Sequence, residues 1–172
     1  MRAPPPTLRL VAWALVALGA VVLWRRYDAL PARVPVFRGV GGAEVLRARS
    51  FLSVGRLVAL GAAQAGAASA MARASREHPG WRRFWNAAAA VAGLKTLLEC
   101  AGFAQRAPRV ERACLAGTAL AVGAFLVVAA RWWRRGELRA PPRPSRGTSA
   151  ALALAFVLWA LAVAVPALLP PR

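Results

Sequence analysis

Acidic residues, histidine and cysteine are scarce in this chain, and their scarcity argues against most kinds of catalytic site. Only six aspartates and glutamates stand against 24 lysines and arginines in 172 residues. The one histidine is His78, and the two cysteines, Cys100 and Cys114, do not have the spacing of a metal-binding motif. No set of paired carboxylates and no glycine-rich phosphate motif is present. The sequence therefore predicts a protein that is not an enzyme and that carries no metal or other cofactor.

Long polar stretches are also absent, which leaves no room for a soluble domain. Apolar residues make up 59% of the chain and are grouped in blocks of roughly 20 residues, the length that crosses a hydrocarbon core of about 30 Å. The first block ends in Trp24, Arg25 and Arg26 rather than at a small-residue cleavage site, so we expect an uncleaved first span. The sequence predicts an all-α integral membrane protein with a structured outer loop between its first two helices. Its single domain, residues 1–172, is expected to be a bundle of five transmembrane helices at about residues 8–24, 51–72, 84–104, 113–130 and 150–169.

The positive charge is large, but its distribution does not predict nucleic-acid binding. The net charge of +18 comes from short basic clusters between the apolar blocks, where arginines anchor spans and set their orientation. Lys95 is the only lysine, and the abundance of arginine, alanine, glycine and proline is typical of a GC-rich bacterial genome. With the N-terminus inside, the inner segments hold twelve arginines and the outer segments ten. We therefore predict a protein of the bacterial inner membrane with a cytoplasmic N-terminus and the lipid bilayer as its main partner.

The outer loop, residues 25–50, has the pattern of a folded segment rather than of a plain tether. Pro31 and Pro35 favour extended backbone in the residues before them. The glycine-rich stretch 39–42 favours a turn, and residues 43–50 then predict a short strand or an interfacial turn. We expect a small hairpin-like cap on the outer membrane surface. The apolar side chains expected to face the bundle or the lipid are Val34, Val36 and Phe37.

The same loop resembles that of a bacterial membrane family, the SdpI-type small multi-spanning proteins of toxin immunity and signalling. In that family the first span is followed by a pattern like LP-x-x-VP-x-HF, a glycine, and a polar-aromatic stretch that leads into the second span. The residues that match are Leu30, Pro31, Val34 and Pro35, with Gly41 or Gly42 at the glycine position and Ser50 just before the second span. The resemblance covers the loop and its flanking spans.

Two departures from the family pattern bear on what the resemblance implies. Phe37 stands where the family has histidine, and residues 44–47 replace its Asp-x-Trp portion, so any function of that histidine is missing here. The resemblance implies an immunity, sensing or accessory role, in which the loop or the bundle meets a peptide or a partner membrane protein. The alternative is a proline-rich surface loop that has no relationship to the family.

Polar residues inside the second and third apolar blocks are the best internal indication of a site. Arg56 and Gln64 lie in the second block, and Lys95 and Glu99 in the third. Because these spans are antiparallel and joined by a short loop, Arg56 and Glu99 reach the same depth, and Lys95 shares the helix face of Glu99. We predict that Glu99 pairs with both Arg56 and Lys95, and that Gln64 lies close to Lys95. The surplus positive charge favours a water-accessible pocket or an anionic ligand, and a purely structural bridge is the alternative.

Two further patterns concern packing. Small residues four positions apart in the second block let helices approach closely, which predicts packing within the bundle or, alternatively, a homodimer seam. The two rows are Gly61, Ala65 and Ser69, and Ala62, Gly66 and Ala70. Cys100 and Cys114 are expected in the same half of the bilayer. We favour two small buried residues, although a disulfide is geometrically possible in an oxidising periplasm.

Different classes of function remain open at this point. The first is the immunity, sensing or accessory role implied by the resemblance, which predicts a concave surface on the outer loop and a closed bundle interior. The second is a small oligomeric ion or substrate transporter or channel, which predicts a water-filled cavity that reaches Lys95 and Glu99. The third is a structural membrane subunit.

Overall fold

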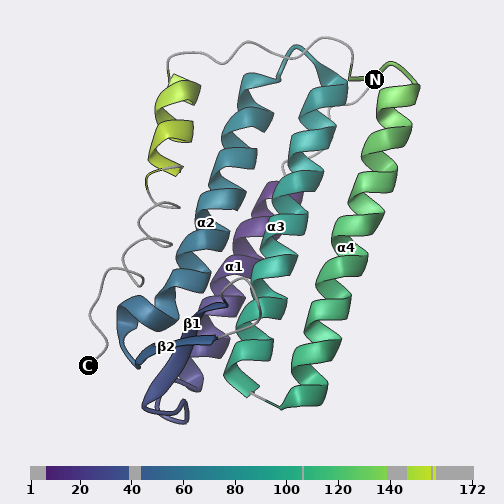
Figure 1. The fold of residues 1–172 in the computed structure, drawn as a ribbon. Helices are drawn as coiled ribbons and strands as arrows, with labels where there is room; N and C mark the ends of the chain where they lie inside the picture. Colours follow the sequence, from purple (N-terminus) through teal and green to yellow (C-terminus); the bar gives the residue numbers. More distant parts are fainter. Residues whose placement is uncertain (1–6, 39–43, 106, 139–146, 156, 158–172) are drawn as a thin grey trace.

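The computed structural model describes residues 7–38, 44–105, 107–138, 147–155 and 157. Within these ranges the chain forms long helices that run side by side, with a small β-hairpin at one end of the bundle (Figure 1). A further helix begins at residue 147 and is described to residue 155, on the α2 side of the bundle. The elements in chain order are α1 (Thr7–Arg25), β1 (Arg33–Arg38), β2 (Glu44–Ala48), α2 (Phe51–Ala74), α3 (Pro79–Gln105) and α4 (Pro108–Arg134).

The helices α1 to α4 are each long and apolar enough to cross a membrane. At about 1.5 Å per residue, α2 extends over roughly 36 Å, which exceeds the hydrocarbon thickness of about 30 Å. These helices contain the first four predicted spans. Of the fifth predicted span, residues 150–155 and 157 are helical, and the rest lies outside the described residues. The structure therefore shows an all-helical bundle with four candidate membrane-spanning helices.

Helix α3 lies at the centre of the bundle and contacts α1, α2 and α4. Close approaches are made at glycines, because a helix position without a Cβ atom lets the neighbouring helix come near. Gly61 of α2 lies directly against the side chain of Thr96, and Gly93 of α3 lies against the backbone of Ala12 in α1. One predicted small-residue row is buried, as expected for packing within the bundle, and its members are Gly61, Ala65 and Ser69.

The loop between α1 and α2 forms the predicted hairpin. Strands β1 and β2 are antiparallel, with Arg33 opposite Ala48 and an irregularity in register between Pro35 and Phe37. Val34 is fully buried and packs with residues from α1, α2 and α3, so the prediction that it faces the bundle is confirmed. The side chains of Val36 and Phe37, and the whole of Gly41 and Gly42, lie outside the described part of the chain.

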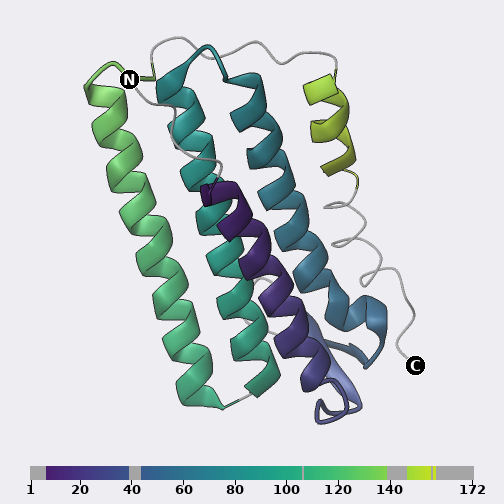
Figure 2. The same ribbon diagram turned by 180° about the vertical axis from the view of Figure 1, so that it is seen from behind.

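The two ends of the bundle are built from different segments. The hairpin and the α3–α4 connection lie at one end, hereafter the hairpin end, as both views show (Figures 1 and 2). The α2–α3 connection and residues 135–138 lie at the opposite end. There, an Arg83 guanidinium nitrogen lies 3.7 Å from a carboxylate oxygen of Glu137, and the Glu137 carbonyl packs directly onto Gly80.

Candidate functional site

Arg49 joins the two ends of the outer loop. Its Nη1 atom lies 2.7–2.9 Å from the backbone oxygens of Tyr27, Asp28 and Leu30, which form the turn after α1. The guanidinium also lies 5.2 Å from the centre of the Tyr27 ring, within the range of a cation–π contact. The Arg49 backbone N–H donates to the carbonyl of Ala32 at 2.7 Å. One residue thus fixes the start of α2 against the end of α1.

Ser50, the small polar residue just before the second span, is the N-cap of α2. Its backbone is extended, and its hydroxyl accepts a hydrogen bond from the Ser53 backbone N–H at 3.1 Å. The Ser53 hydroxyl in turn accepts from the Ser50 backbone N–H at 2.8 Å, which completes a capping box. This reciprocal pair satisfies N–H groups that the first turn of a helix leaves without partners. These two serines therefore stabilise the first turn of α2 where it follows the hairpin.

Arg56 reaches back from α2 to the hairpin instead of pairing directly with Glu99. Its Nη2 donates to the carbonyl of Pro35 at 3.0 Å, and its Nε donates to the carbonyl of Ser53 at 3.1 Å. No ion pair joins Arg56 to Glu99, whose carboxylate is paired with Lys95. The prediction of a direct pair is wrong because the hairpin lies close enough to offer its own acceptor to Arg56.

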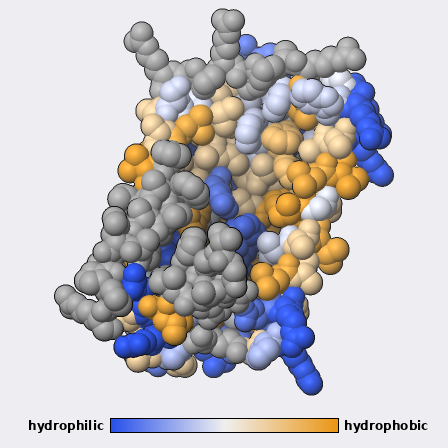
Figure 3. Space-filling model, in the orientation of Figure 1, coloured by the Kyte–Doolittle hydropathy of each residue, from blue (hydrophilic) through white to orange (hydrophobic). Residues whose placement is uncertain are grey.

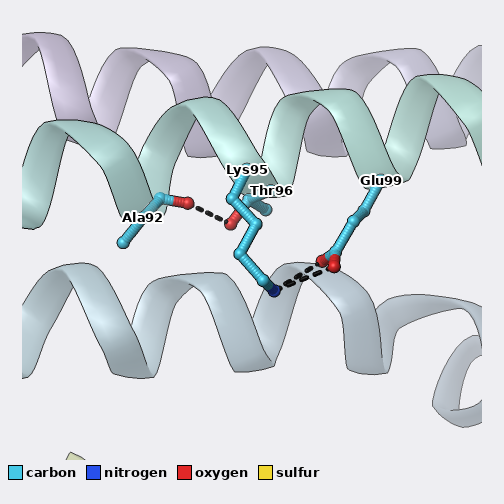
Figure 4. Close-up of polar contacts among 4 residues, drawn as sticks. All are labelled: Ala92, Lys95, Thr96 and Glu99. Carbon is cyan, nitrogen blue, oxygen red and sulfur yellow. Dashed lines mark hydrogen bonds and ion pairs between the residues drawn. The ribbon is translucent and has the colours of Figure 1, made fainter. Parts of the chain in front are cut away.

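Lys95 and Glu99 form the predicted pair on α3. The Lys95 Nζ lies 2.9 Å from each carboxylate oxygen, and the two side chains are 29% and 32% exposed. Both leave α3 on the side of α2, as does Thr96, whose hydroxyl donates to the carbonyl of Ala92 (Figure 4). Gln64 is half-buried and makes no hydrogen bond to Lys95. The local i, i+4 pairing is confirmed, and the position of Gln64 close to Lys95 stays a prediction.

A pocket of about 370 Å³ opens beside this pair, at the meeting point of the hairpin with α2, α3 and α4. Hydrophilic residues are visible among apolar ones midway along this face of the molecule (Figure 3). The lining includes two carboxylates but no lysine or arginine among the described residues. The members of this hairpin-end pocket are Pro35, Leu57, Leu98, Glu99, Gly102, Phe103, Glu111, Cys114, Leu115 and Thr118.

Helix α4 forms one wall of the pocket, through Glu111, Cys114, Leu115 and Thr118. None of the residues of α4, which the structure describes throughout, is buried. The contacts between the helices include the rings of Phe84 and Phe125, 5.2 Å apart between centroids, and two glycines. A Cβ atom on Gly102 would lie 3.3 Å from the Cys114 Cβ, and one on Gly117 would lie 3.2 Å from a methyl carbon of Leu98. Thr118 lines the pocket, and its hydroxyl oxygen is buried without a hydrogen-bond partner in the described structure.

The two cysteines are free and face different neighbours. Cys100 is fully buried against Gly19 of α1, whereas Cys114 is half-buried and lines the pocket. The disulfide that the sequence left open is therefore not formed, and Cys100 is the small buried residue that we favoured. Within the described ranges, no group of three or more histidine, cysteine, aspartate or glutamate side chains is arranged to hold a metal ion.

Three residues of the site escaped sequence reasoning. Arg49 looked like one more membrane-flanking arginine, Glu111 lay outside the predicted fourth span, and Thr118 lay within a span without polar neighbours. The charge of Glu111 in the first turn of α4, two residues before that span, was the available signal for the acidic lining. In comparisons with known proteins, no family model, no curated protein and no solved structure matches this chain.

Proposed function

We propose that this protein is a bacterial inner-membrane protein that recognises a ligand or partner at its hairpin end, in an immunity, sensing or accessory role. The observation that carries the proposal is the hairpin-end pocket, which is lined both by Pro35 of the outer loop and by Glu99 of the intramembrane pair. A pocket that joins a surface loop to a charged pair inside the bundle is suited to recognition, because occupancy changes contacts in both. Intramembrane ionisable residues are functional-site candidates by default.

The resemblance to the SdpI-type proteins supports the same class of role. Of the residues that carry the resemblance, Leu30 and Val34 are buried anchors of the loop, Pro35 offers its carbonyl to Arg56, and Ser50 caps α2. These four residues of the motif thus lie where the loop meets the bundle. Because Phe37 replaces the family histidine, the proposal assigns recognition to the pocket rather than to the loop tip.

Transport is the second candidate, and exposure of the Glu99 carboxylate beside an open pocket favours it. The packing beyond Lys95 argues against a continuous path. There, Gly61 and Thr96 close the seam between α2 and α3, and Gly93 and Ala12 close the seam between α1 and α3. A pocket that ends within the bundle fits binding better than conduction.

The proposal includes an orientation, with the hairpin end on the periplasmic side. A periplasm-dependent reporter such as alkaline phosphatase, fused after Arg172, is expected to be active, and the same reporter fused after Gly80 is expected to be inactive. The reverse pattern would place the hairpin end in the cytoplasm and contradict a role in meeting an external ligand.

Site-specific photo-crosslinking in cells tests recognition itself. A photoreactive amino acid at Leu115, which lines the pocket, should give a discrete adduct that the same group at Leu126 does not give. Leu126 is a matched control because it lies on the same helix and is 59% exposed. Identical products from both positions, or lipid adducts only, would contradict a recognition site in the pocket.

A further inference from the structure

The charged side chains that line the hairpin-end pocket are acidic, whereas the second and third spans together carry a net positive charge. The second and third spans carry two cations and one carboxylate, which by count alone favours an anion. Both cations are occupied elsewhere: Lys95 lies against Glu99, and Arg56 donates to backbone carbonyls of Pro35 and Ser53. Neither of them lines the pocket.

The pocket instead presents two carboxylates set among apolar walls. Glu99 contributes from α3 and Glu111 from α4, and the side chains of Leu57, Leu98 and Phe103 supply apolar surface. Both carboxylates are already engaged by protein groups, Glu99 by Lys95 and Glu111 by another interaction. A carboxylate has about four lone-pair positions, so a bound ligand can share each of them with its protein partner.

Resting on the proposed recognition function, we propose that the pocket binds an amphipathic organic cation, a protonated amine on an apolar body. A charge-assisted hydrogen bond to a carboxylate is stronger beside apolar surface than in bulk water, and Leu57, Leu98 and Phe103 provide such surface. A divalent metal ion fits less well, since the described residues offer no suitable cluster of ligands. The volume of about 370 Å³ lies within the range of small-molecule sites, roughly 300–1,000 Å³. The unpartnered Thr118 hydroxyl in the same wall can serve as an additional acceptor or donor.

A series of probes that share one apolar body tests the sign of the charge. Saturable binding of radiolabelled 4-phenylbutylamine is measured with the protein in nanodiscs, with empty nanodiscs as the correction for partitioning into lipid. The unlabelled competitors are the amine, the neutral 4-phenylbutanol and the anionic 4-phenylbutyrate. We expect the amine to compete at least about tenfold better than the other two, since charged hydrogen bonds contribute the difference.

Variants connect the binding to the pocket. Glu111→Gln should weaken amine binding about tenfold, and the matched control Glu137→Gln, at the opposite end, should leave it unchanged. Glu99→Gln alone leaves the Lys95 ammonium without its partner and can fold poorly for that reason. The double variant Glu99→Gln, Lys95→Met is therefore tested beside it, because it removes both charges.

The outcomes separate this inference from the proposed function. Equal or tighter binding of 4-phenylbutyrate would overturn the assignment of a cation while leaving recognition at the pocket in place. Loss of amine binding in Glu137→Gln as large as in Glu111→Gln would overturn it as well, and so would the absence of saturable binding by any of the three probes. The crosslinks from Leu115 and Leu126 decide on the proposed function independently of these results.

Discussion

The two ends of the bundle hold their polar groups in different ways. At the hairpin end, Arg49 and Arg56 donate to backbone carbonyls of the loop, and the Lys95–Glu99 pair borders an open pocket. Towards the opposite end, Ser69 and Asn86 are 5% and 4% exposed, and the Ser69 hydroxyl and the Asn86 side-chain oxygen have no partner in the described structure. Small residues close the helix seams there. The difference shows that the hairpin supplies backbone acceptors to charged side chains, whereas at the opposite end the ion pair of Arg83 and Glu137 joins two side chains.

The largest expected effect comes from removing the clamp at the hairpin end. Arg49→Met should lower the free energy of unfolding by on the order of 2–4 kcal/mol, because a charged donor leaves several backbone carbonyls. Arg49→Lys should recover only part of this loss, since an ammonium cannot both stack on Tyr27 and reach all of the acceptors. Arg33→Met is the control, because the Arg33 side chain is exposed. The free energy of unfolding of each variant is measured with the protein in nanodiscs. Equal stability of Arg49→Met and Arg33→Met would show that the loop is not held by Arg49.

Close packing away from the hairpin end predicts a second effect, which a glycine pair can measure. Gly93→Ala should destabilise the protein by about 1–3 kcal/mol, because the new methyl group meets the backbone of Ala12. Gly123→Ala, where a Cβ atom meets nothing within 4 Å, should be neutral or stabilising by up to about 1 kcal/mol. If both variants unfold at the same temperature as the parent protein, the α1–α3 seam is not tightly closed.

The charged pair should show a smaller effect and a defined coupling. Glu99→Gln should cost on the order of 1–2 kcal/mol, less than for a fully buried pair, because water reaches about a third of each side chain. Adding Lys95→Met should restore stability. Double-mutant cycles should give a larger coupling energy for Lys95 with Glu99 than for Arg56 with Glu99. A larger coupling for the Arg56 cycle would mean that Arg56, rather than Lys95, is the main partner of Glu99.

The smallest expected difference compares two serines. Ser50→Ala removes the N-cap of α2 and should cost about 1 kcal/mol. Ser69→Ala removes a buried hydroxyl that has no partner, and it should be neutral or slightly stabilising. Thermal unfolding of both variants under the same conditions is the measurement. A larger loss of stability for Ser69→Ala than for Ser50→Ala would mean that the Ser69 hydroxyl makes a hydrogen bond, against this prediction.

Features that depend on local sequence were predicted well. The first four spans follow from the length of apolar runs, the hairpin from prolines and glycines, and the Lys95–Glu99 pair from the i, i+4 geometry of a helix. Depth along a helix can also be estimated from its rise per residue. These quantities require no knowledge of how one element is rotated against another.

Features that depend on tertiary geometry were not predicted. Arg56 was expected to pair with Glu99, but its partner is a carbonyl of Pro35, whose position depends on how the hairpin folds onto α2. Arg49 was indistinguishable in sequence from arginines that merely flank a span. The acidic lining of the pocket combines Glu111 of α4 with Glu99 of α3, and its prediction would require the rotation of both helices about their axes.

The absence of buried residues on α4 has a consequence for how a molecule enters the pocket. Because α4 contributes no residue to the buried core, moving it away from α3 uncovers only half-buried side chains of α4. In a bilayer those side chains would meet acyl chains, so the separation carries almost no hydrophobic penalty. If the protein is inserted in the membrane as proposed, an amphiphile dissolved there has a lateral route between α3 and α4 and need not approach through water. The α4 wall of the pocket, which holds Glu111, would then also be the entrance for the ligand.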